Sequence, residues 1–218
     1  NNYQSLVNKV KKYCSIDGLS RYEEAVVDEL KKSVDSKSMN YERDGLGSII
    51  FSQNNKPSTG PIIQIAAHMD EVGFIVQDIT DKGQLILSMI GGIWPLTVIG
   101  TKAVVYNAKG QKYEGVFGHT SIHILEIEKR NKVPELKDLY VDLGFNSKKE
   151  VQDNFIEVGS RVCLSGDFFQ MNNDYVVAKA MDNRAGVAVL EEVMQRVQNK
   201  KLNNQEYFVG TVKEEVGT

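Results

Sequence analysis

The chain has 218 residues, a length that suits one domain or two unequal ones and allows a sizeable core without disulfide bridges. Hydrophobic residues make up 41% and charged residues 25%, close to the average for folded proteins, which excludes a disordered or collagen-like chain. The net charge of −3 offers no basic surplus, so neither nucleic acid nor a membrane is expected as a partner. The N-terminal stretch lacks the apolar run of a signal peptide, and the two cysteines form no CxxC pair, so a cytoplasmic location is expected.

The first part of the chain predicts two helices and a strand pair. Apolar residues recur at helical spacing over residues 3–14. Ser20 and Glu23 have the spacing of a capping box, which predicts the start of a second helix. The Asp44–Gly45 pair predicts a turn between two strands, the second of which covers Ser48–Ser52.

A change of pattern in the middle of the chain indicates an inserted domain. The apolar run Pro61–Ala67 is typical of a strand that is covered on both faces. From Val72 to Leu164, short β segments alternate with turns, which predicts a small barrel or sandwich. Ser147 and Glu150 form a second capping box, which predicts one short helix there.

The α/β pattern returns after this insertion. A strand, a helix and a buried strand are predicted in that order, at Tyr175–Ala178, Arg184–Gln198 and Tyr207–Val212. We therefore predict an α/β domain formed by residues 1–71 and 165–218. A β-rich, barrel-like domain of residues 72–164 interrupts it.

Acidic or imidazole side chains follow each of the three strands predicted for the α/β domain. They are His68 with Asp70, then Asp182, and finally Glu214 with Glu215. Ligands of open α/β sheets bind beyond the carboxyl ends of the strands. If the three strands are parallel neighbours, these side chains converge at one edge of the sheet.

The first two of these motifs each allow two interpretations. His68 and Asp70 share a face of an extended chain, so Asp70 could hold one ring nitrogen while the other binds a metal. The alternative is a hydrogen-bonded histidine at a strand end. Asp182 could bridge two cations through its two oxygens, or it could cap the helix that follows. Lys179 and Arg184 either pair with carboxylates or are solvated surface charges.

The pair Glu214 and Glu215 is informative because adjacent residues of a strand point to opposite faces. Both can serve one site only if the strand ends before them. One could then ligate a metal while the other acts as general base towards a water. The alternative is a pair of solvated glutamates at a strand end.

Three segments of the chain resemble, in order, the leading motifs of the glutamyl/tetrahedral aminopeptidases, which are dinuclear metallopeptidases. The segments are AAHMDEVGFIV (Ala66–Val76), KAMDNRAGVAVLE (Lys179–Glu191) and VKEEVG (Val212–Gly217). The stretch DLYVDLGFNSKKEV (Asp138–Val151) resembles the β-rich oligomerisation domain of that family. The resemblance covers the whole chain. It implies a three-layer α/β metallopeptidase domain interrupted by the barrel-like domain.

Carried over by position, the resemblance implies a role for each candidate residue. His68 binds one metal, Asp182 bridges both metals, and Glu215 binds the other. Glu214 is the general base, Asp70 orients His68, and the peptide bond after Asp182 is often cis in the family. The implied cofactors are two divalent metal ions, zinc or cobalt. The implied function is removal of single N-terminal residues from short peptides by a homo-oligomer, a dodecamer by resemblance.

The family pattern also has an Asp and a His ligand beyond its EEVG motif, and Thr218 is the last residue here. We therefore expect a fragment of a longer protein, and we expect the 218-residue chain alone to lack peptidase turnover. Alternative interpretations are a related dinuclear carboxypeptidase or N-acyl deacylase, and a catalytically inactive truncated subunit.

Overall fold

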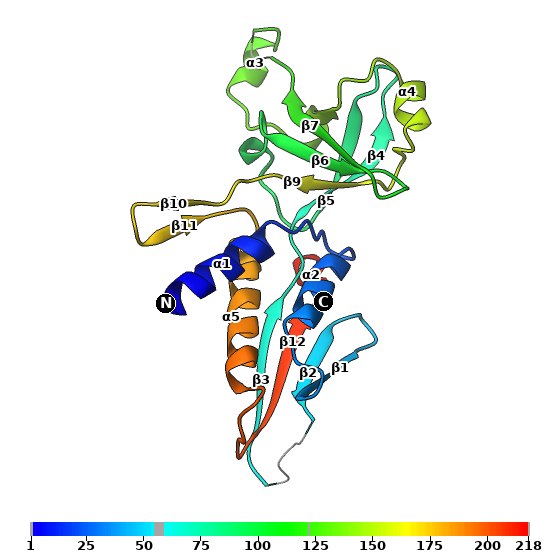
Figure 1. Cartoon of the computed structure of the whole chain (residues 1–218). Helices are drawn as coiled ribbons and strands as arrows, with labels where there is room; N and C mark the ends of the chain where they lie inside the picture. Colours follow the sequence, from blue (N-terminus) through cyan, green and yellow to red (C-terminus); the bar gives the residue numbers. More distant parts are fainter. Residues whose placement is uncertain (1, 55–58, 122, 218) are drawn as a thin grey trace. The chain divides into compact units, whose positions relative to one another are not determined.

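The computed structural model describes residues 2–54, 59–121 and 123–217 and divides the chain into two compact units (Figure 1). Unit 1 combines Asn1–Glu71 with Asp167–Thr218, and unit 2 consists of Val72–Gly166. The second predicted boundary, after residue 164, falls two residues before the observed one.

Unit 1 is built on a four-stranded mixed sheet with the strand order β1-β2-β12-β3. β12 runs parallel to β3 and antiparallel to β2, which in turn is antiparallel to β1. The hairpin predicted at Asp44–Gly45 is confirmed, because it joins β1 and β2. The strands are β1 (Met39–Arg43), β2 (Ile49–Gln53), β3 (Ile62–His68) and β12 (Gln205–Thr211).

Three helices pack together against the sheet of unit 1: α1 (Asn2–Cys14), α2 (Glu24–Lys32) and α5 (Met181–Val197). Their apolar faces form a single core with the strands, which removes these side chains from water. Figure 1 shows α5 lying alongside β3 and β12. The described residues thus supply one helical layer and the sheet of the three-layer arrangement that the resemblance implies.

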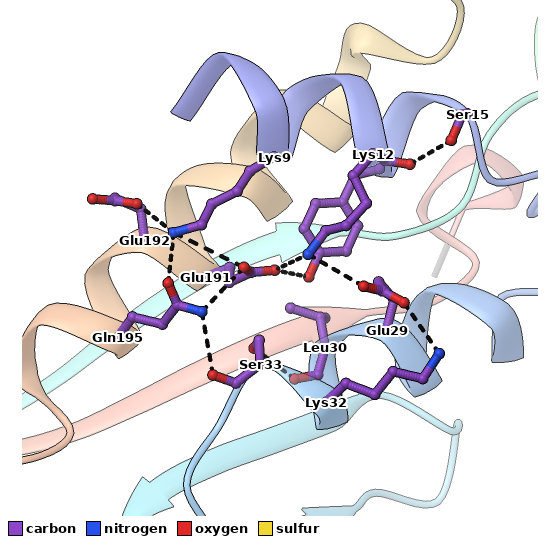
Figure 2. A network of polar contacts seen from close by, with 11 residues as sticks. Lys9, Lys12, Ser15, Glu29, Leu30, Lys32, Ser33, Glu191, Glu192 and Gln195 are labelled. Atoms are coloured by element: carbon purple, nitrogen blue, oxygen red, sulfur yellow. Dashed lines mark hydrogen bonds and ion pairs between the residues drawn. The ribbon is translucent and has the colours of Figure 1, made fainter. Parts of the chain in front are cut away.

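A buried polar network fastens the three helices to one another (Figure 2). Glu191 of α5 is buried and accepts hydrogen bonds from the Tyr13 hydroxyl and from Lys12 Nζ, the latter at 2.9 Å. Lys12 also pairs with Glu29 of α2 at 3.3 Å, and Lys9 pairs with Glu191 at 3.9 Å. Burial and the adjacent Glu191 carboxylate raise the pKa of Tyr13 above its ordinary value. The position of α1, and hence of the loop after it, is fixed by these contacts.

Unit 2 is a closed antiparallel barrel. Of the two architectures predicted for this segment, a barrel or a sandwich, the barrel is confirmed. Phe74 and Phe117 are fully buried in its interior, with ring centroids 5.4 Å apart. Ser147 caps a short helix by accepting a hydrogen bond from the Glu150 N–H at 3.2 Å, as predicted. The barrel strands are β4 (Gly73–Ile79), β5 (Leu85–Ile90), β6 (Lys102–Tyr106), β7 (Lys112–His119), β8 (Leu139–Asp142) and β9 (Arg161–Leu164), and the helices are α3 (Ile127–Arg130) and α4 (Lys148–Asp153).

Two predictions about strands of unit 1 are wrong. The strand predicted at Tyr175–Ala178 is present as β11 (Tyr175–Val177), but it is not a parallel neighbour of β3 and β12. It pairs instead with β10 (Phe169–Met171) in a separate two-stranded hairpin. β3 is also not covered on both faces, because Ile62 and Ile63 are 69% and 43% exposed. Among the described strands, β3 lies at an edge of the sheet.

The capping box predicted for Ser20 and Glu23 is wrong as well. α2 begins at Glu24, and its N-cap residue Glu23 makes no side-chain capping hydrogen bond. Both side chains form hydrogen bonds elsewhere, to residues 70 and 213. Ser20 and Glu23 therefore have the spacing of a capping box, but their side chains contact residues that are distant in the sequence.

Two further features of the described residues concern membrane-spanning helices and the cysteines. No helix within the described ranges is both long enough and apolar enough to cross a bilayer. Cys14 and Cys163 are both buried, one in each unit.

Candidate metal centre

The carboxyl ends of the parallel strands β3 and β12 bring His68 close to the glutamate pair. His68 ends β3 and is the register partner of Thr211, which ends β12. The Met69 N–H donates to the Thr211 carbonyl at 2.8 Å and closes this end of the sheet. Lys213 then adopts a left-handed conformation with φ 61°, and the short 3₁₀ helix η3 (Glu214–Val216) follows. The strand alternation therefore ends before the two glutamates, so both can turn to the same side.

The candidate ligand atoms lie close together. One ring nitrogen of His68 and one carboxylate oxygen each of Glu214 and Glu215 lie within 4.8 Å of one another. His68 Nε2 is 3.9 Å from Glu214 Oε2 and 3.0 Å from Asp182 Oδ1. Asp182 therefore lies beside the same ring nitrogen of His68 as Glu214 does. The side chains of Asp182 and Glu214 are 90% and 56% exposed, which leaves both carboxylates accessible to solvent and solutes.

Asp182 does not cap the helix that follows it. Asp182 and Asn183 have non-helical backbone angles, and the peptide bond between them is cis, as the family resemblance predicted. Asn183 supplies the cap instead, since its Oδ1 accepts the Gly186 N–H at 3.1 Å. The carboxylate of Asp182 is therefore left free to face His68.

Asp70 fixes the orientation of the His68 ring. His68 Nδ1 lies 3.2 Å from the backbone carbonyl oxygen of Asp70 and 3.4 Å from its Oδ1. Because both oxygens are acceptors, Nδ1 must carry the hydrogen. Nε2 is left on the side of Asp182 and Glu214, which is the nitrogen that a metal-binding histidine held in this way would offer to a cation.

The carboxylate of Asp70 also holds the turn that carries the two glutamates. It is completely buried, and its Oδ1 and Oδ2 accept the backbone N–H groups of Glu214 and Glu215, each at 3.1 Å. The Ser20 hydroxyl donates to Oδ2 at 2.6 Å. Asp70 thus connects the His68 segment to the glutamate turn, and the sequence interpretation missed both the turn contacts and Ser20.

A buried cluster of charged side chains includes Glu71, the residue that follows Asp70. Lys179 Nζ pairs with Asp17 and with Glu71 Oε1, the latter at 3.0 Å, and Arg184 Nη2 lies 3.7 Å from the same Glu71 oxygen. Burial alone lowers the pKa of Lys179, but Glu71 and Asp17 outweigh it and raise that pKa above its ordinary value. Of the two interpretations of Lys179 and Arg184, pairing with carboxylates is confirmed, and the solvated surface charge is wrong.

The order of these motifs and their placement in the fold agree with one known family. The sequence profile of the M42 glutamyl aminopeptidases matches residues 47–218. This chain belongs to the M42 glutamyl aminopeptidase family. The M42 family is one of metal-dependent peptide hydrolases.

Several M42 relatives match nearly the whole chain. The putative aminopeptidase FrvX of Escherichia coli is 33% identical over 211 residues, which are 97% of this chain and 58% of the relative. The aminopeptidase APDkam598 from Desulfurococcus kamchatkensis has a TM-score of 0.88 at 32% identity, over 99% of this chain and 57% of that one. The TET1 peptidase of Pyrococcus horikoshii has a TM-score of 0.86 at 30% identity, over 97% and 62%. This M42 chain therefore spans about three fifths of the length of these relatives.

The electrostatics of this M42 site fit a divalent cation. Burial raises the pKa of Glu215 above its ordinary value, and the carboxylates of Asp70, Glu214 and Asp182 raise it further, while His68 opposes them. A cation relieves this concentration of negative charge. An imidazole nitrogen beside carboxylate oxygens is also a donor set that zinc binds.

The substitution Glu215→Gln is expected to stabilise the metal-free protein. The raised pKa means that the contribution of Glu215 to stability is fully present below its ordinary pKa of 4.5 and is lost as the pH rises through the folded-state value. At pH 7 the carboxylate therefore destabilises the fold, and glutamine removes that cost. Calorimetry of the metal-free protein at pH 7 should show a higher melting temperature for the variant, with the difference shrinking towards pH 4.

The same substitution should weaken metal binding. We expect a larger loss than the about 10- to 100-fold that removal of a ligand-orienting residue costs. Isothermal titration with zinc measures it. A variant that melts lower than wild type without metal, or binds zinc as tightly, contradicts this assignment of Glu215.

Proposed function

We propose that the complete protein is a metal-dependent aminopeptidase that removes single N-terminal residues from short peptides. One observation carries this proposal: His68, Asp182 and the glutamate pair converge at the carboxyl ends of β3 and β12 in a chain of the M42 family. The accessibility of Asp182 and Glu214 supports it, because a substrate must reach the reacting groups.

In this proposal each side chain has a separate task. His68 Nε2, Asp182 and Glu215 would hold two divalent cations, zinc or cobalt, and Asp182 would contribute to both. Cations bound there would supply Lewis-acid activation of a water and of the scissile carbonyl. A carboxylate oxygen of Glu214 takes the proton of that water and delivers it to the departing amine. Asp70 keeps His68 and the glutamate turn in register throughout.

A panel of blocked and unblocked substrates tests this function. The complete protein loaded with zinc or cobalt should cleave aminoacyl p-nitroanilides and short peptides one residue at a time. A chelator should abolish cleavage, and N-acetylation of the substrate should prevent it, because an aminopeptidase needs the free α-amine. Preferred cleavage of N-acetylated substrates would support an N-acyl deacylase instead, release of C-terminal residues a carboxypeptidase, and no cleavage an inactive subunit.

We also propose that the protein forms a homo-oligomer, with unit 2 as its oligomerisation domain. The Pyrococcus horikoshii TET1 peptidase, which shares this fold, can assemble into a tetrahedron or a large octahedral shell. Large apolar side chains on the surface of unit 2 support the proposal: Ile124 and Ile127 are each 77% exposed, and Trp94 is 58% exposed. Analytical ultracentrifugation of the complete protein should show a species of many subunits, and a monomer would contradict the proposal.

A further inference from the structure

One short segment near the N-terminus, residues 13–23, touches every part of the chain that carries a candidate ligand. We call it the clamp segment. Its first contact is with the segment that follows His68. Ser20 Oγ donates to Asp70 Oδ2 at 2.6 Å, and the Glu71 N–H donates to the Gly18 carbonyl at 2.9 Å. The clamp segment therefore lies directly against the residue that orients His68.

The second contact is with the segment that carries Asp182. Arg184, two residues further along, is fully buried. Its Nη1 donates to the carbonyl oxygens of Tyr13 and Ile16 at 2.6 and 2.8 Å. The start of α5, and with it the position of Asp182, is thus attached to the backbone of the clamp segment.

The third contact is with the glutamate turn. Glu23 is buried, and its Oε1 accepts the backbone N–H groups of Lys213 and Arg21, both at 3.0 Å. These two residues have left-handed backbones, with φ of 61° and 78°, a conformation that costs free energy in residues other than glycine. One carboxylate therefore stabilises both unusual conformations, including the one that turns Glu214 towards His68.

We propose that Ser20 and Glu23 are positioning residues for the metal centre. This inference rests on the proposed function. Ser20 occupies Oδ2 of Asp70, which prevents the carboxylate from rotating away from the N–H groups of Glu214 and Glu215. Without the Ser20 hydroxyl, the histidine and the two glutamates lose their fixed spacing, and a ligand set tolerates displacements of only about 0.5 Å. The clamp segment lies before residue 47, where the match to the family profile begins.

The test is the substitution Ser20→Ala in the complete protein. The dissociation constant for zinc, measured by isothermal titration, should rise by about 10- to 100-fold. Turnover at saturating metal should show a lower kcat with an almost unchanged KM, because substrate contacts are not altered. Ser20→Thr keeps a hydroxyl and should recover most of the zinc affinity.

Glu23 gives a second pair of variants. Glu23→Gln keeps an oxygen that can accept both N–H groups, so it should lose much less zinc affinity than Glu23→Ala. This comparison also decides the matter if Ser20→Ala does not fold. Ser52→Ala is the matched control, because Ser52 is a buried serine of β2 whose register partner Tyr207 lies near the start of β12, away from the carboxyl ends of β3 and β12.

The outcomes separate this inference from the proposed function. Zinc affinity of Ser20→Ala within about twofold of wild type overturns the inference alone, as does a threonine variant as weak as the alanine variant. A loss of zinc affinity in Ser52→Ala equal to that in Ser20→Ala also overturns it, because the effect would then be general. A wild-type protein that binds no divalent cation contradicts the proposed function and the inference together.

Discussion

The substitution Glu214→Gln is expected to lower kcat of the complete protein by about two to four orders of magnitude. Glutamine has nearly the size of glutamate, but its amide oxygen cannot take a proton from water near neutral pH. The backbone contact between Glu214 and Asp70 does not involve the side chain, so the turn should keep its shape. Steady-state kinetics on an aminoacyl substrate, together with metal analysis, would measure both effects.

The control for this variant is Glu42→Gln, an exposed glutamate on β1 of the same sheet. It should have wild-type kcat and metal content. Turnover of Glu214→Gln within tenfold of wild type would remove Glu214 from the mechanism. A loss of turnover that only follows a loss of metal would make Glu214 a ligand rather than a base.

The second large effect is expected on stability. Arg184→Ala should lower the free energy of unfolding by about 3–5 kcal/mol, because it leaves the buried carboxylate of Glu71 without one of its two cations. It also removes the donors to the carbonyl oxygens of Met69, Tyr13 and Ile16. Denaturant unfolding of the metal-free protein measures the loss directly.

Arg196→Ala is the matched control, on the same helix. Arg196 is half exposed and pairs with Glu192 one turn away, an arrangement worth about 0.3–0.5 kcal/mol. If Arg184→Ala destabilises the protein no more than Arg196→Ala does, the buried cluster of Lys179, Arg184, Asp17 and Glu71 does not stabilise the fold.

The architecture of both units was largely predictable from local patterns. The β-hairpin turn at Asp44–Gly45, the helical spacing of α1 and the dense strands of the barrel are properties of neighbouring residues, which a sequence displays directly. The polar residues after β3 and β12 were also informative. Parallel neighbours end at the same edge of a sheet, and here His68 and the glutamate pair do meet.

Contacts between distant segments explain what the sequence could not reveal. Ser20 and Glu23 have the spacing of a capping box, but their partners lie about 50 and 190 residues away, and nothing local distinguishes the two uses. The strand at Tyr175–Val177 was correctly identified, but its partner in a separate hairpin could not be inferred from its own residues. Asn183 was overlooked because Asp182, beside it, is an equally good capping residue.

The most direct test of the central claim is to locate metal in crystals of the complete protein grown with zinc. Anomalous scattering measured at the zinc absorption edge should give a peak about 2.0–2.1 Å from His68 Nε2, in contact with carboxylate oxygens of Asp182 or Glu215. A crystal that holds zinc only at other residues, or shows no anomalous peak at the ends of β3 and β12, would contradict the account.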